Sequence, residues 1–330
     1  MAKIVLGIGT SHTPLLTLGG ERWAERAADD LKNKALNLSD GRWIAYDELA
    51  KEVDNRYADV CTTEHFLQKS KACQAALDRL ANELRAAKPD VVVVIGDDQD
   101  ELFSLSNMPC VSIFYGEEII THPRDIKESS PSWLPTVAEG YAQDDAHVFK
   151  GSPEFALDLI RDLISRHVDM GAAAKVDDSR IAGFGHAYGF VVKRLFGGQQ
   201  IPMVPILLNT YFPPNVLSPA RCHEIGRLLR TAIESHPKDL RVAVVASGGL
   251  SHFVVDEKLD KTVTDALATG DSAALRSLPP SALNAGSSEI LNWVMAAGAL
   301  EGLRNRWIEY QPLYRTPAGT GIGAAFALWS

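Results

Sequence analysis

Apolar runs along the chain alternate with segments whose apolar positions recur at helical spacing. The runs 91–96 (VVVVIG) and 241–249 (RVAVVASGG) are almost continuously apolar and rich in β-branched residues. Such runs are typical of strands buried on both faces of a sheet. Shorter apolar runs predict four further strands, at 3–8, 110–114, 202–210 and 321–329.

Between these runs the apolar positions follow the period of a helix. Segment 64–88 carries an apolar stripe, which predicts a long amphipathic helix. The same pattern predicts helices at 152–168, 219–235, 273–279 and 287–302. Segment 14–60 is polar, with prolines and glycines near its start followed by a charged stretch of helical character.

The alternation of strands and helices predicts an α/β fold. We expect a single domain over 1–330, with a central, mixed and largely buried sheet flanked by helices on both faces. No repeat, low-complexity stretch or linker divides the chain. Two proline-rich stretches, 123–135 and 213–214, are expected to be surface loops rather than domain boundaries.

Composition narrows the class of protein further. The chain is 46% hydrophobic and carries a formal net charge of −9, which disfavours nucleic acid as a partner. No apolar stretch approaches the roughly 20 residues that a membrane span requires. The first apolar run is too short for a signal peptide. The four cysteines form no close pair, which favours free thiols in a reducing compartment, so the expected location is the cytoplasm.

The candidate chemistry lies where predicted strands end. Ligands of open α/β sheets bind beyond the carboxyl ends of the strands. His12 follows the first strand, the acidic segment 97–101 follows the second, His252 follows the strand at 241–249, and His186 lies in another glycine-rich turn. Each histidine taken alone could equally be an ordinary loop residue that is hydrogen-bonded to the backbone. Three in comparable positions favour a site for metal binding or proton transfer.

The order of the motifs resembles that of the class III extradiol ring-cleavage dioxygenases. These motifs are GTSHTP near the N-terminus, the acidic turn, GHAYGF, GGLSH, a glutamate on a late helix before WVMAAGAL, and YRTPAGTGIGAAF at the end. The nearest branch is that of the protocatechuate 4,5-dioxygenase β subunit and the gallate-type enzymes. The resemblance spans nearly the whole chain, with about 15–88 as an extended helical insertion.

This resemblance implies a metal site with one altered ligand. His12 matches the first histidine ligand and Glu289 matches the carboxylate ligand. Gln99 stands where the family has its second histidine ligand. A glutamine oxygen is a weaker ligand for Fe(II) than an imidazole. Asp98 or Asp100 could supply a carboxylate instead, and the sequence leaves this choice open.

The resemblance also assigns roles around the substrate. His252 matches the acid–base histidine, and His186 matches a second pocket histidine that lies close to the substrate or bound oxygen. Gly319, Thr320 and Thr13 are expected on the substrate side. Because Gly319 stands where the protocatechuate enzyme has a serine near the substrate carboxylate, we expect a ligand other than protocatechuate.

The implied function is an Fe(II)-dependent extradiol enzyme that inserts O₂ into a catechol- or gallate-like aromatic substrate. The resemblance further implies a homo-oligomer such as a dimer, and it leaves open a separate small α subunit. Two other interpretations remain. The missing histidine fits a metal-free or altered-metal binding protein on the same scaffold, and the acidic turn suits a Zn²⁺-dependent hydrolase.

Overall fold

A computed structural model describes the whole chain, residues 1–330, as one α/β domain around a nine-stranded sheet. The strand order is β11-β13-β1-β10-β4-β9-β5-β8, and β12 also pairs with β13. The strands of this sheet are β1 (Lys3–Thr10), β4 (Val91–Asp97), β5 (Val111–Phe114), β8 (Gly171–Ala173), β9 (Met203–Leu208), β10 (Arg241–Ser247), β11 (His252–Val254), β12 (Asn305–Tyr314) and β13 (Thr320–Trp329).

The sheet is mixed, as the sequence predicts. The four central strands β1, β10, β4 and β9 are parallel to one another. β5 runs antiparallel to β9 on one side, and β13 runs antiparallel to β1 on the other. The parallel strands therefore end at a common edge, which is where the candidate site lies.

Both faces of the sheet are covered because side chains alternate along each buried strand. In β4, Val91, Val93 and Ile95 enter one apolar core, whereas Val92 and Val94 enter the other. The first core includes five helices: α5 (Pro153–Ser165), α7 (Pro219–Ser235), α8 (Glu257–Thr269), α9 (Ser272–Arg276) and α10 (Ile290–Ala299). The second includes four: α1 (Trp23–Asp30), α3 (Thr63–Ala87), α4 (Leu134–Gly140) and α6 (His186–Leu195).

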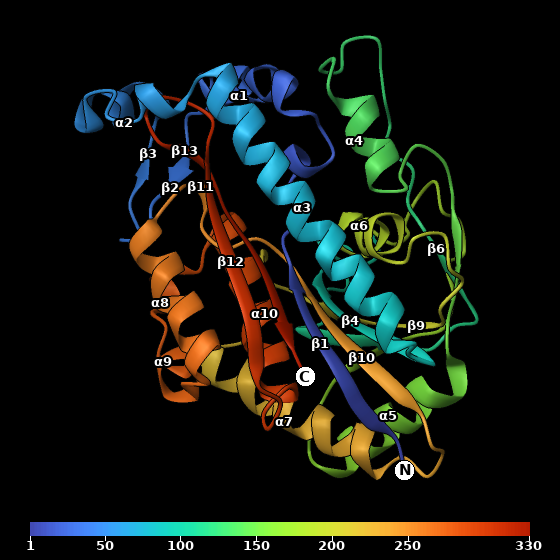
Figure 1. Ribbon diagram of the computed structural model, residues 1–330. Coiled ribbons are helices and arrows are strands. Elements are labelled where there is room, and N and C mark those ends of the chain that lie inside the picture. The colour runs from blue at the N-terminus through green and yellow to red at the C-terminus, as the bar shows by residue number, and fades with distance from the viewer.

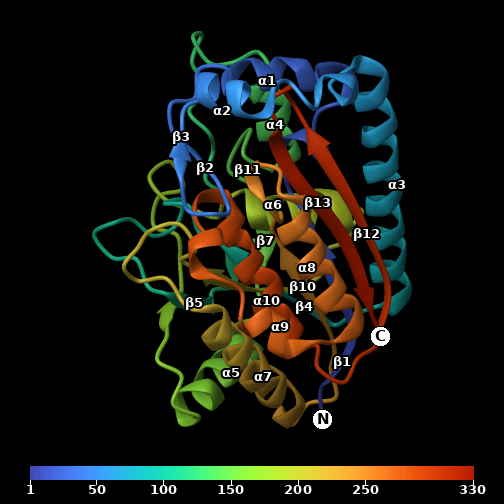
Figure 2. The ribbon, with the colours of Figure 1, turned by 90° about the vertical axis from the view of Figure 1, so that its left-hand side faces the viewer.

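The two views show this layering directly. α3 runs across one face of the sheet over β1 and β10 (Figure 1), and after rotation it stands on the opposite side of β12 and β13 from α8 and α10 (Figure 2). The segment before α3 also forms a small satellite core, in which the short strands β2 (Leu36–Asn37) and β3 (Trp43–Ile44) pack with α2 (Tyr46–Val53). The remaining pair, β6 (Glu118–Ile120) and β7 (Val148–Lys150), forms a separate ribbon.

The structure corrects one expectation about the late helix. Glu289 does not lie on that helix but ends a 3₁₀ segment, Ala285–Glu289, immediately before α10. The segment places the carboxylate at the start of the helix rather than along its side. No helix combines the length and the apolar character needed to cross a membrane.

Candidate metal centre and active site

Three adjacent parallel strands bring polar side chains to one edge of the sheet. His12 lies two residues past β1, Ser247 is the last residue of β10, and Asp97 is the last residue of β4. Gln99 follows Asp97 by two residues. β10 lies between the other two strands, so these side chains are neighbours in space although they are far apart in sequence.

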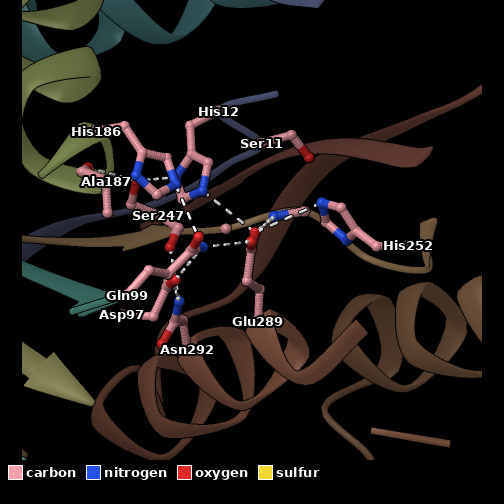
Figure 3. Close-up of polar contacts among 12 residues, drawn as sticks. Ser11, His12, Asp97, Gln99, His186, Ala187, Ser247, His252, Glu289 and Asn292 are labelled. Carbon is pink, nitrogen blue, oxygen red and sulfur yellow. Dashed lines mark hydrogen bonds and ion pairs between the residues drawn. The ribbon is translucent and has the colours of Figure 1, made fainter. Parts of the chain in front are cut away.

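Two further side chains reach this edge from opposite faces of the sheet. His186 is the first residue of α6, which belongs to one core, and Glu289 precedes α10, which belongs to the other. One ligand atom each of His12, His186 and Glu289 lies within 4.8 Å of the others, and all three residues are buried. Figure 3 shows the three side chains pointing toward a common centre.

Hydrogen bonds fix the tautomer of His12. Its Nδ1 lies 2.9 Å from the hydroxyl of Ser247, which itself donates to the carbonyl of Ala187 at 2.7 Å. Because the single hydroxyl proton is already used, His12 must donate from Nδ1. Its Nε2 then presents a lone pair toward the centre.

The same holds for the other two histidines. His186 donates from Nδ1 to Glu101 Oε1 at 2.9 Å, and His252 donates from Nδ1 to the carbonyl of Leu250 at 2.9 Å. An imidazole that donates from Nδ1 keeps Nε2 free as a metal ligand or proton acceptor. In their neutral forms the three imidazoles therefore leave Nε2 free, although only His12 and His186 belong to the cluster of potential ligands.

The cluster contains an unsatisfied contact. His12 Nε2 lies 3.2 Å from Glu289 Oε2, yet this buried nitrogen has no hydrogen-bond partner. A lone pair facing a carboxylate oxygen at this distance is repulsive unless a proton or a cation lies between them. Two imidazole nitrogens and one carboxylate are a donor set that suits a divalent transition metal. The residues present therefore fit a metal ion.

Glu289 is held in an ionised state. Burial opposes its ionisation, but the charge that His252 and His12 carry when protonated lowers its pKa well below the usual range. Its Oε2 accepts a hydrogen bond from the backbone amide of Gly249 at 2.7 Å, and its Oε1 accepts one from the hydroxyl of Tyr211 at 3.2 Å. His252 Nε2 lies 3.8 Å from Oε2. The carboxylate is thus oriented from two sides.

Gln99 lies beside the cluster but turns its amide nitrogen toward it. This nitrogen donates to Asp97 Oδ2 at 2.8 Å and lies 3.4 Å from both His186 Nε2 and Glu289 Oε1. Burial, together with the charge of Glu289, raises the pKa of Asp97 to about 6. In this conformation Gln99 presents a donor rather than its oxygen, and His186 joins His12 and Glu289 in a set of potential ligands.

The two aspartates considered as substitutes point elsewhere. Asp98 is buried and caps its own turn, accepting hydrogen bonds from the amides of Glu101, Leu102 and Phe103 at 2.9–3.1 Å. Asp100 is exposed and adopts a left-handed backbone conformation with φ of 67°. Neither carboxylate belongs to the cluster.

Glu101 orients His186 from behind. Burial opposes ionisation of this carboxyl, but contact with His186 lowers the pKa of Glu101 to about 2. Burial likewise disfavours the imidazolium, yet Glu101 raises the pKa of His186 to about 8. Gly185 makes the contact possible, because a Cβ there would lie 1.7 Å from Glu101 Oε2.

The expected substrate-side residues are only partly near this centre. Thr13 is buried beside His12, and its carbonyl accepts a hydrogen bond from the amide of Leu16. Thr320 donates its hydroxyl to Asp30 Oδ2 at 2.7 Å, and Gly319 lies against the ring of Tyr57 with φ of 84°. The structure does not bring Gly319 or Thr320 into the polar contacts of the cluster.

Sequence reasoning gave no individual role to four residues that shape this centre, although two of them lie in the acidic segment 97–101. They are Asp97, Glu101, Tyr211 and Ser247. Three of them lie at or just beyond strand ends, since Ser247 and Asp97 end their strands and Tyr211 follows β9 by three residues. The strand-end rule that pointed to His12 therefore also applies to these three residues.

Fold and site together define a single-domain α/β protein with a buried histidine–carboxylate centre at the carboxyl edge of its sheet. Comparison with known proteins identifies the family. Residues 60–326 match the family described as the catalytic LigB subunit of aromatic ring-opening dioxygenase. The chain belongs to this family, as the order of its motifs predicts.

The chain is also similar to characterised relatives. It is 30% identical to the gallate dioxygenase of Pseudomonas putida over 37% of this chain and 38% of that protein. It is 26% identical to the 2,3-dihydroxyphenylpropionate/2,3-dihydroxicinnamic acid 1,2-dioxygenases of Comamonas testosteroni and Mycobacterium ulcerans. Those matches cover 54% of this chain and 49% and 48% of the relatives. The matched segments thus span half of each relative or less.

Proposed function

We propose that this protein is an extradiol-type ring-cleaving dioxygenase. It acts on a catechol- or gallate-like aromatic substrate at a non-haem Fe(II) held by His12, His186 and Glu289. The observation that carries the proposal is the convergence of these three buried side chains, with both imidazoles presenting Nε2. Two histidines and one carboxylate are the ligand set of the non-haem Fe(II) oxygenases. The family and the names of the relatives support an aromatic substrate.

A ferrous ion supplies a redox-active centre through which electrons of a catecholate can reach O₂. In extradiol cleavage both oxygen atoms enter the product, and the ring carbon–carbon bond beside the two hydroxyl-bearing carbons breaks. The protein's part is to hold the reactants together, which lowers the entropic share of the barrier. The burial of all three proposed ligands also limits access of water to the reacting groups.

His252 is the proposed acid–base residue. Its Nδ1 proton is held by the carbonyl of Leu250, so Nε2 is free to accept a proton from a substrate hydroxyl. Burial lowers the pKa of His252, which keeps the imidazole neutral and able to act as a base near neutral pH. Its Nε2 lies 3.8 Å from Glu289 Oε2, close to the proposed metal ligands.

The test combines metal content with oxygen uptake. The protein is loaded with Fe(II) under argon, its iron is quantified, and O₂ consumption is followed with catechol, protocatechuate and gallate. We expect about one iron per chain and uptake of one O₂ per ring opened, with the yellow absorbance of a ring-opened semialdehyde from catechol and protocatechuate. His12→Ala is expected to lose both the iron and the uptake.

His147→Ala is the matched control, because His147 pairs with Asp144 in a surface turn and has no contact with the cluster. It should keep both iron and activity. Stoichiometric iron without uptake on any catechol would exclude ring cleavage. Turnover that persists with Zn²⁺ under strict anaerobiosis would favour a hydrolase instead.

A further inference from the structure

A cavity of about 250 Å³ lies next to the proposed metal centre. Its walls are the loop that follows β9, from Thr210 to Pro219, and the segment from Pro280 to Leu291 that contains Glu289. None of its twelve lining residues carries a charge. A cavity of roughly 150 Å³ is enough to hold a benzene ring. This one can therefore hold a ring or an arm of similar size.

Tyr211 joins the cavity to the centre. It lines the cavity, and its hydroxyl donates to Glu289 Oε1 at 3.2 Å. A second cavity of about 220 Å³, bounded by His223 and Trp329, shares no residue with the centre. The cavity thus adjoins the proposed metal centre through Tyr211.

Thr210 leaves one polar atom of the cavity wall without a partner. It is only 3% exposed, and its hydroxyl makes no hydrogen bond. A buried hydroxyl without a partner is unfavourable, because it has lost its hydrogen bonds to water. A ligand that offers an acceptor at this point restores one such bond. The cavity therefore favours an arm that is mostly apolar and carries one neutral acceptor.

The cavity wall is also preformed, because hydrogen bonds within the protein hold its loop. Asn209, which is buried, donates to the carbonyls of Phe212 and Asn215 at 2.8 and 2.9 Å and accepts from the amide of Phe212 at 2.9 Å. These three bonds fix the course of the loop that carries Thr210 and Tyr211. A preformed wall binds its ligand with less loss of conformational entropy.

We infer that this cavity binds a neutral, largely apolar substituent of the aromatic substrate. The inference rests on the proposed function and names its substrate class, namely catechols with an uncharged side arm of about the size of a phenyl ring or a short ketone. A carboxylate placed in an uncharged cavity loses its hydration without gaining a counter-ion. Protocatechuate and gallate are therefore poor occupants of this cavity.

The test measures binding apart from turnover. Titration calorimetry of the Fe(II)-loaded protein under argon compares catechol, protocatechuate, and 3- and 4-phenylcatechol. We expect at least one phenylcatechol to bind about tenfold or more tightly than catechol, because burial of apolar groups in a fitted pocket gives at least this much. Protocatechuate should bind no more tightly than catechol.

Leu217→Trp fills the cavity from a half-buried position that tolerates a larger side chain. It should reduce the phenylcatechol-to-catechol affinity ratio to about one. Ala268→Trp is the matched control, because Ala268 lies at the other cavity and is exposed. It should leave that ratio unchanged. A ratio that is the same in Leu217→Trp and the parent protein, or protocatechuate binding more tightly than both phenylcatechols, overturns the inference.

Thr210→Val provides a second test that preserves shape. It should weaken 4-acetylcatechol, whose ketone accepts the Thr210 hydrogen bond, by about tenfold relative to 4-propylcatechol. Equal effects on both compounds would count against the role of Thr210. Oxygen uptake is then measured separately. Affinity that depends on the substituent, without any O₂ uptake, would contradict the proposed dioxygenase function. O₂ uptake on protocatechuate, together with an affinity ratio that Leu217→Trp does not change, would contradict only the role of the cavity.

Discussion

Two buried polar centres of this molecule differ in how fully their charged atoms are satisfied. In the arginine–aspartate centre, Asp30 accepts hydrogen bonds from Arg315 at 2.7 and 3.2 Å, from Arg26 at 3.1 Å and from Thr320 at 2.7 Å. Both carboxylate oxygens are therefore occupied by partners from the protein. In the histidine–glutamate centre, His12 Nε2 has no such partner although it faces Glu289.

This difference separates a structural contact from a binding site. Asp30 and Arg315 are 285 residues apart, and their pairing ties the N-terminal segment to the end of the chain. That centre needs nothing more to be stable. The histidine–glutamate centre is equally buried, but its His12–Glu289 contact requires a proton or a cation between the two atoms. A buried polar group left unsatisfied by the protein indicates what the protein binds.

The largest expected effect comes from removing the carboxylate of the arginine–aspartate centre. Asp30→Ala leaves the buried guanidinium of Arg315 without its counter-charge, which costs about 3–5 kcal/mol. Urea unfolding followed by circular dichroism should show this loss, while the fraction that remains folded should still bind iron. Asp47→Ala serves as the control, since Asp47 is exposed and lies 3.7 Å from Lys34. Its effect should stay within about 0.5 kcal/mol.

The opposite pattern would erase the distinction between the two centres. If Asp30→Ala abolished iron binding without lowering stability, the arginine–aspartate centre would belong to the functional site. The expected placement of Thr320 beside the substrate would then regain support.

The sequence predicts most of the fold because the central strands are buried on both faces. The continuous apolar run in β4 and the helical stripe of α3 leave one interpretation each, and the bounds of α7 agree with the predicted 219–235. β12 is different. Its residues are mostly half-buried, and apolar and polar side chains are mixed along it, so neither an apolar run nor a clear alternation marks it. It is a strand because β13 offers a partner, and pairing of that kind leaves little trace in the sequence.

The site, like the fold, can be predicted from the sequence only in part. Strand ends and motif order brought His12, His186, His252 and Glu289 into one hypothesis, and the structure places them around one centre. The orientation of the Gln99 amide could not be predicted, because it depends on a hydrogen bond to Asp97 within a tight turn. The role of Glu101 depends on a contact with His186 across 85 positions. Such contacts are properties of the folded chain.

A third buried carboxyl sharpens the comparison, because neutral groups alone satisfy it. Asp260 accepts hydrogen bonds from the amide and hydroxyl of Ser251 at 2.8 and 2.7 Å and from the hydroxyl of Tyr310 at 2.6 Å. Burial raises its pKa to about 7. A folded-state pKa above the unfolded value near 3.9 means that the folded state holds the proton more tightly.

The contribution of Asp260 to stability is therefore fully present below about pH 4 and is lost as the pH rises through about 7. Asp260→Asn should flatten the pH dependence of the unfolding free energy over this interval by a few kcal/mol at most. Thermal unfolding in matched buffers from pH 4 to pH 8 measures it. A parent and variant whose stabilities run parallel over that range would show that Asp260 ionises as readily in the folded as in the unfolded state.

The smallest expected effect tests how the histidine–glutamate centre is oriented. Glu101 accepts the Nδ1 proton of His186, whereas the equivalent atom of His12 faces only the neutral Ser247. Glu101→Gln keeps the size of the side chain but removes the charge that fixes His186. We expect the dissociation constant for Fe(II) or Co²⁺ to rise about 10–100-fold, as is usual for loss of a partner that orients a ligand.

Two readouts separate positioning from general damage. The Co²⁺ absorption spectrum should change in Glu101→Gln while the unfolding temperature changes little, and Glu118→Gln at an exposed position of β6 should change neither. An unchanged spectrum and metal affinity in Glu101→Gln would mean that His186 does not depend on Glu101 to reach the metal. The centre would then rest on His12 and Glu289, and the contrast between its two histidines would lose its physical basis.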